Sequence, residues 1–104
     1  ERFDLVVANM VLHHVPSPAD IFLEASELMI DGGYLVISEL RSHDQDWARE
    51  NCGDLWLGFE PEELNAWAND AGLETGEAMF IGLRNGFQVQ VREYRKPVRH
   101  DLEQ

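Results

Sequence analysis

The sequence predicts an α/β fold, namely half of a three-layer sandwich built on a sheet with parallel and antiparallel strands. Two nearly continuous apolar runs, at residues 3–8 and 34–37, flank a segment whose apolar residues recur at helical spacing, and the second strand is expected to continue to about Leu40. Such runs are typical of strands that are buried on both faces of a parallel sheet. Further along, the dipeptide Asn85-Gly86 separates two apolar segments and favours a tight hairpin turn.

The segment between the first two runs is expected to form an amphipathic helix. Ser17 is a favourable cap residue, and Pro18 suits the first helical turn. The expected core face consists of Ile21, Phe22, Ala25, Leu28 and Met29. Gly32 and Gly33 are predicted to end the helix, because glycine accepts the left-handed conformation of a helix end. Strand, helix and strand then form a right-handed βαβ unit with parallel strands.

The second half of the chain predicts a helix and a β-hairpin. Residues 44–52 are expected to form a short helix, followed by a loop. A longer helix is predicted to begin near Pro61 and to end at Gly72. Its expected buried face consists of Leu64, Trp67, Ala68 and Ala71. Strands at residues 78–83 and 87–94 are expected to pair antiparallel.

Apolar and polar residues alternate along the last predicted strand. Its apolar residues Phe87, Val89, Val91 and Tyr94 alternate with Gln88, Gln90 and Arg92. Residues 1–97 are predicted to form one domain, and residues 98–104 are predicted to be a frayed tail. No internal repeat or low-complexity segment interrupts this organisation.

The composition restricts the partners of the chain. Its formal net charge is −12, with 8 basic and 20 acidic residues, so phosphate backbones and anionic membranes are repelled. No apolar run approaches the roughly 18 residues of a membrane span. We therefore expect neither nucleic acid nor a membrane as a partner. Cys52 is the single cysteine, which excludes an internal disulfide and favours a reducing, cytoplasmic location.

Polar residues follow both predicted parallel strands, at residues 9–14 and 39–43. Ligands of such sheets lie beyond the carboxyl ends of the strands. His13 and His14 are adjacent and point in different directions, so we expect no shared metal ion and no metal site. One of them could act as a general base, because imidazole exchanges its proton near neutral pH. Spacing alone favours the alternative, in which one histidine packs against the loop and the other is solvated.

Several of these motifs together resemble a known family. Phe3-Asp4-Leu5-Val6-Val7-Ala8-Asn9-Met10-Val11-Leu12-His13-His14-Val15 and Asp31-Gly32-Gly33-Tyr34-Leu35-Val36-Ile37 resemble the second half of a class I S-adenosylmethionine-dependent methyltransferase. Residues 43–47 and 57–64, with 71–73, resemble methyltransferase domains fused to ArsR-type winged-helix regulators. Quinone-biosynthesis methyltransferases are similar over the same stretch. The resemblance covers residues 3–97.

The resemblance implies a partial Rossmann-like sandwich, in which this chain supplies strands 4 to 7 of a seven-stranded sheet and the last strand is antiparallel. The family's first strand, its glycine-rich cofactor loop and the acidic residue that holds the ribose are expected before residue 1. The implied reaction is methyl transfer from S-adenosylmethionine to a small-molecule acceptor. Arsenite is disfavoured as that acceptor, because the arsenite branch relies on several cysteines.

Site residues follow from the same resemblance. Asn9 and Met10 are implied to meet the cofactor. His13 and His14 are implied to lie beside the transferable methyl group as catalytic residues. The substrate-binding residues that would line the acceptor pocket are Glu39, Arg41 and His43.

Two rival interpretations remain open. The first is a non-catalytic α/β fragment or dimerisation module, because the strand at residues 3–8 would have a bare edge that could pair with a second copy. We therefore expect a homodimer through this edge. The second is another nucleotide-binding enzyme, such as a dehydrogenase, which is disfavoured because its last strand is usually parallel.

Overall fold

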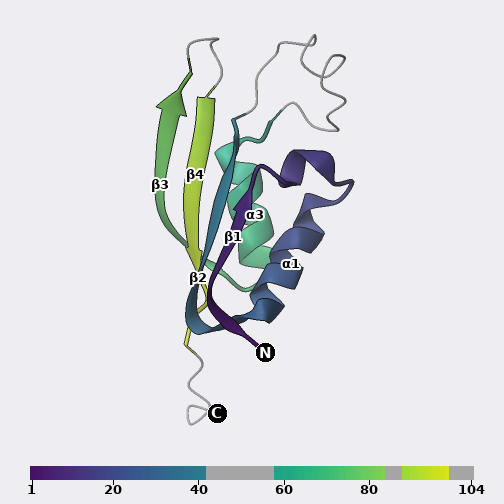
Figure 1. Ribbon diagram of the computed structural model, residues 1–104, viewed down its shortest axis with the longest axis vertical. Helices are drawn as coiled ribbons and strands as arrows, with labels where there is room; N and C mark the ends of the chain where they lie inside the picture. The colour runs from purple at the N-terminus through teal and green to yellow at the C-terminus, as the bar shows by residue number, and fades with distance from the viewer. Residues whose placement is uncertain (42–57, 84–87, 99–104) are drawn as a thin grey trace.

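The computed structural model describes residues 1–41, 58–83 and 88–98 of the chain. The described residues form one four-stranded sheet of order β1-β2-β4-β3, as Figure 1 shows. The elements in chain order are β1 (Phe3–Asn9), the 3-10 turn η1 (Leu12–His14), α1 (Pro18–Leu28), β2 (Met29–Leu40), α3 (Pro61–Asp70), β3 (Glu74–Gly82) and β4 (Gln88–Arg95). The predicted α/β class is confirmed. The predicted helix at residues 44–52 lies outside the described residues.

The pairing of the strands follows the predicted order. β1 and β2 are parallel, with Val7 opposite Val36 and Asn9 opposite Ser38. β4 lies between β2 and β3 and is antiparallel to both. The βαβ unit and the antiparallel last strand are therefore confirmed. The first strand of the hairpin begins at Glu74, four residues before the predicted start.

The core lies between the sheet and its two helices. It combines side chains from the two helices, from β1, β2 and β4, and from η1 and the segments on either side of α3: Ala8, Leu12, Phe22, Ala25, Met29, Leu35, Ile37, Phe59, Leu64, Ala68, Leu73 and Tyr94. The predicted face of the second helix is confirmed, since Trp67 and Ala71 also pack against this cluster. Leu28 was predicted to lie on the core face of the first helix. It is exposed instead, because α1 ends at this residue. No helix in the described residues is long and apolar enough to cross a membrane.

The opposite face of the sheet is open in the described residues. Phe3, Leu5 and Val7 of β1 are 47%, 54% and 59% exposed, whereas the sequence predicted burial on both faces. The difference has a simple cause, because α1 and α3 pack on one face only. A continuous apolar run indicates a strand with two apolar faces, but it does not indicate whether other elements cover both faces.

The glycine pair does not end the first helix as predicted. Met29 is already extended, and Gly32 and Gly33 lie within the bounds of β2. Gly32 has φ +84° and donates its N–H to the carbonyl of Lys96 at 2.7 Å. A Cβ at Gly33 would lie 3.0 Å from the carbonyl oxygen of Ile30. The glycines therefore permit a tight backbone crossing at the entry to β2.

The polar backbone groups at the helix ends have identifiable hydrogen-bond partners. Lys96 Nζ donates to the carbonyl oxygens of Ser26 at 2.7 Å and Met29 at 3.1 Å, beside the carboxyl end of α1. At the start of α3, Glu60 and Glu63 form a reciprocal capping box. Gly72 follows this helix with φ +84°, which confirms the predicted end.

Candidate functional site

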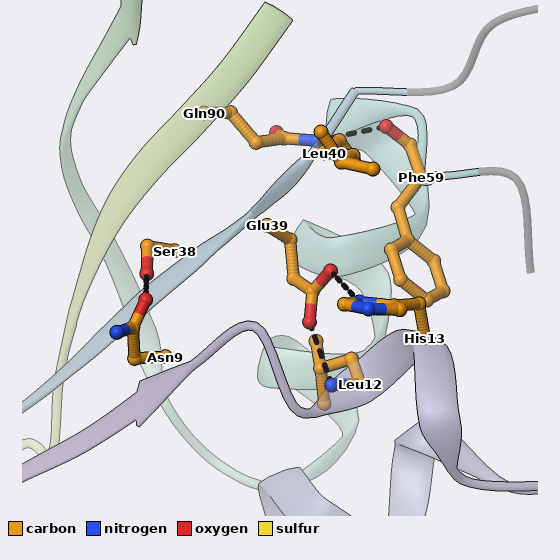
Figure 2. A network of polar contacts seen from close by, with 8 residues as sticks. All are labelled: Asn9, Leu12, His13, Ser38, Glu39, Leu40, Phe59 and Gln90. Atoms are coloured by element: carbon orange, nitrogen blue, oxygen red, sulfur yellow. Dashed lines mark hydrogen bonds and ion pairs between the residues drawn. The ribbon is translucent and has the colours of Figure 1, made fainter. Parts of the chain in front are cut away.

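The candidate site is built where β1 and β2 reach their carboxyl ends (Figure 2). β1 ends at Asn9, and Met10 takes φ +59°, which is uncommon for a residue other than glycine. The N–H of Met10 donates to the carbonyl of Ser38 at 2.8 Å, so this sharp turn is tied to β2. The chain then enters η1, which carries both candidate histidines.

A buried carboxylate joins the two strand ends. Glu39 is fully buried, and its Oε1 lies 2.9 Å from Nδ1 of His13. Its Oε2 accepts the backbone N–H of Leu12 at 2.6 Å. Both oxygens therefore have partners, as a carboxylate removed from water requires. Figure 2 shows the carboxylate of β2 reaching across to the turn that follows β1.

The two histidines have different environments. His13 is 6% exposed and contacts Glu39, whereas His14 is exposed. Their ring centroids lie 4.0 Å apart with the planes tilted by 46°. A carboxylate only accepts hydrogen bonds, so Nδ1 of His13 carries the proton in this pair. Nε2 is then the basic nitrogen of the neutral ring, which is the arrangement that an oriented general base needs.

Asn9 lies next to this pair but on the open face of the sheet. Its Oδ1 accepts a hydrogen bond from the hydroxyl of Ser38, which fixes the carboxamide (Figure 2). The amide NH₂ group is then directed away from Ser38, and it is a donor. Ser38 was not among the residues that the sequence predicted for this site. The register Asn9–Ser38 shows why the hydroxyl matters, since the residues are directly opposite in the parallel pair.

The three residues predicted to bind the acceptor, Glu39, Arg41 and His43, differ in how the structure places them. Glu39 has both oxygens engaged within the protein, so it orients His13 and Leu12. Arg41 is half-buried beyond the end of β2, where its Nη1 donates to Oε1 of Gln88 at 3.3 Å. His43 lies outside the described residues. Among the residues that the structure describes, no group of three potential ligands could hold a metal ion.

A second polar network, absent from the predictions, lies on the helix-covered face of β4. Gln90 is fully buried, and its Nε2 donates to the carbonyl of Phe59 at 2.8 Å (Figure 2). Arg92 is 7% exposed, and its Nε donates to Oε1 of Gln90 at 2.7 Å. The sequence grouped Tyr94 with the valines, but Tyr94 is buried on the face of Gln90 and Arg92. The alternation itself was the available signal, because it fixes two faces without saying which is inside.

Tyr94 shows the effect of this burial on a titrating group. Its hydroxyl donates to Oδ1 of Asn65 at 2.8 Å. Burial raises the pKa of Tyr94 to about 12, and this outweighs the opposing effect of the neighbouring Arg92 cation. The hydroxyl therefore stays neutral and acts as a structural donor at physiological pH.

Comparison with known proteins agrees with the fold. A family model described as a methyltransferase domain matches residues 1–77. The ubiquinone biosynthesis O-methyltransferase of Stutzerimonas stutzeri is 30% identical over 96 residues, which cover 80% of this chain and 40% of that protein. The enzyme of the same name from Pseudomonas paraeruginosa is 30% identical over 95 residues, covering 79% of this chain. The chain spans about 40% of the length of these curated relatives.

Solved structures share the same architecture. A SAM-dependent methyltransferase from Methanosarcina mazei has a TM-score of 0.74 at 20% identity, covering 93% of this chain and 60% of that one. The 1,6-didemethyltoxoflavin-N1-methyltransferase of Burkholderia thailandensis, solved with S-adenosylhomocysteine, has a TM-score of 0.75 at 21% identity, covering 92% and 44%. The [4+2]-cyclase SpnF also shares the fold, with a TM-score of 0.77 at 16% identity, covering 94% and 51%. The resemblance to domains fused to ArsR-type regulators stays a prediction.

Proposed function

The chain belongs to the methyltransferase domain family, and we propose that, in the full-length protein, it supports methyl transfer from S-adenosylmethionine to a small-molecule acceptor. The observation that carries the proposal is the pair of His13 and the fully buried Glu39 at the carboxyl ends of β1 and β2. The likeness to ubiquinone biosynthesis O-methyltransferases supports an acceptor oxygen.

His13 is the proposed general base. S-adenosylmethionine supplies an electrophilic methyl group when it is bound. An acceptor hydroxyl must lose its proton as it is methylated, and Nε2 of His13 is suited to take it. Glu39 holds the imidazole in one tautomer through Nδ1 and offsets the positive charge that the ring gains. His14 is exposed and packs on His13, so its proposed role is to shape the path by which the acceptor reaches His13.

Asn9 and Met10 are the proposed cofactor contacts of this chain. The residues present suit part of such a group, because Ser38 fixes the Asn9 carboxamide and turns its NH₂ donors outward. Amide donors of this kind suit the carboxylate of a methionine moiety.

Calorimetry on the full-length protein tests the cofactor assignment. We expect saturable binding of S-adenosylhomocysteine, and an Asn9→Leu variant should weaken it about tenfold through the lost hydrogen bonds. Asn69→Leu is the matched control, since Asn69 is exposed on α3. Absence of binding by the full-length protein would contradict the proposed function.

A second proposal concerns the edge of β1. In the described sheet this strand pairs only with β2, so the backbone N–H and C=O groups of its other edge have no strand partner there. Its side chains Phe3, Leu5 and Val7 are exposed on the open face. Such an edge is a template for another strand, so we propose that a second copy of the chain pairs with it. Light scattering should then report a dimer that an edge substitution, Leu5→Lys, converts to a monomer. A full-length protein that is monomeric at every concentration would show instead that its own chain covers this edge.

A further inference from the structure

Two arginine side chains meet on one aromatic ring at the carboxyl end of the sheet. The guanidinium carbon of Arg41 lies 5.3 Å from the ring centroid of Phe80, and that of Arg92 lies 5.5 Å from the same centroid. The three residues come from β3, β4 and the segment just after β2. A cation over an aromatic face is attracted by the ring, so Phe80 holds both charges in place.

This pair of cations is unusual for such an acidic chain. Only 8 of the 104 residues are Lys or Arg, against 20 Asp or Glu. Even so, neither Arg41 nor Arg92 has a carboxylate within ion-pair distance among the described residues. Glu39, which lies two residues before Arg41, has both oxygens engaged by Leu12 and His13. The two positive charges are therefore not neutralised by these parts of the chain.

The hydrogen bonds of the two arginines fix their orientation without removing their charge. Arg92 is 7% exposed, and its Nε donates to the neutral amide of Gln90. Arg41 donates one Nη1 hydrogen bond to the neutral amide of Gln88. Burying cations against neutral partners costs free energy, and a bound anion would offset that cost. A guanidinium group is also the side chain that best matches a carboxylate, through two parallel hydrogen bonds.

We propose that Arg41, Arg92 and Phe80 form a binding site for a carboxylate carried by the methyl acceptor. The inference rests on the proposed function and names its substrate class: a small acid whose hydroxyl is methylated. Glu39 and Arg41 are two residues apart, a spacing of about 7 Å for an extended backbone. Arg92 lies on the neighbouring strand β4, and Phe80 lies on β3 beyond it. The acceptor would place its reacting atom near His13 and its carboxylate against the guanidinium groups that Phe80 holds.

Benzoate and benzamide are a matched pair of probes, since they differ in charge and share the ring. Calorimetry on the full-length protein should show saturable binding of benzoate and binding of benzamide that is about tenfold weaker, the difference between a charged and a neutral hydrogen-bonded group. An Arg41→Gln variant should abolish this preference. Arg95→Gln is the control, because Arg95 lies on β4 but is exposed and pairs with Glu74.

Equal affinity for the two probes would overturn the inference, and so would a preference that survives in Arg41→Gln. Loss of the preference in Arg95→Gln as well would also overturn it, since it would show a general effect of net charge. The experiment needs no methyl transfer. A protein that prefers benzoate but fails to bind S-adenosylhomocysteine would therefore contradict the proposed function and leave this site standing.

Discussion

The carboxylate of Glu39 and the imidazole of His13 meet at 2.9 Å although 26 residues separate them in the chain. The contact closes the end of the β1–β2 pair from the helix-covered side, and Glu39 also holds the N–H of Leu12. A single buried side chain thus orients the candidate base and fastens the turn that carries it.

Replacing Glu39 with Gln should slow methyl transfer by the full-length protein about 100-fold or more, with little change in cofactor affinity. The amide keeps the shape of the side chain but no longer offsets the charge on the imidazole. Turnover and calorimetry measure the two effects separately. Glu24→Gln is the control, because Glu24 is exposed on α1. Unchanged turnover in Glu39→Gln would leave the pair with a structural role only.

The two histidines should behave differently when each is replaced. His13→Asn should lower kcat by about 100-fold, because the base that takes the acceptor proton is lost. His14→Asn, at an exposed ring, should change kcat by less than about threefold. Steady-state kinetics of the two variants check both expectations, and the reverse ranking would assign the base to His14.

Alkaline pH should destabilise the fold through Tyr94. Its pKa is about 12 in the folded chain and about 10 in the unfolded chain, so the folded chain holds the hydroxyl proton more tightly than the unfolded chain does. The contribution of the neutral hydroxyl to the free energy of unfolding is fully present below pH 10, and it is lost as the pH rises from 10 to 12. Two pKa units correspond to a loss of about 2.7 kcal/mol in the free energy of unfolding.

Denaturant titrations at several pH values measure this loss. Tyr94→Phe should be nearly insensitive to pH between 10 and 12, although it should be less stable at neutral pH because it lacks the hydrogen bond to Asn65. Tyr34→Phe should keep the wild-type loss, since Tyr34 is 41% exposed. An identical pH dependence in Tyr94→Phe and wild type would assign the loss to other groups.

A methyl group at Gly33 should destabilise the fold by about 2 kcal/mol. The new Cβ would lie 3.0 Å from the carbonyl oxygen of Ile30 and 3.3 Å from that of Asp4, and backbone atoms cannot move aside cheaply. Gly82→Ala is the matched strand control, because nothing lies within 4 Å of its Cβ position. Thermal unfolding compares the two variants, and equal Tm values would show that the crossing at Gly33 has room to relax.

The strand and helix order of this fold could be predicted because it depends on local patterns. The apolar runs at residues 3–8 and 34–37 marked the parallel pair, and Pro61 and Gly72 marked the second long helix. The end of α1 was predicted too late. The glycine pair resembled a helix cap, whereas it serves a close approach between β2 and β1 that no local pattern reports.

The candidate site could be predicted only in part. The ends of parallel strands meet at one edge of a sheet, so Asn9, His13 and Glu39 were expected near one another. Their spacing did not reveal that Glu39 binds His13 and not His14, or that Ser38 fixes Asn9. It also did not reveal the buried network of Gln90 and Arg92, because polar residues of a strand are ordinarily expected to face water.

The sequence by itself determined the type and order of the elements and the sheet end at which polar residues gather, since periodicity, caps and turns act over a few neighbouring residues. The tertiary structure decided which side chains meet. The β1–β2 register and the 3-10 turn together bring His13 to Glu39, and helices on one face turn Gln90 and Arg92 inward. Both arrangements depend on contacts between segments far apart in the chain. An alternating pattern therefore defines the two faces of a strand but does not indicate which face the protein buries.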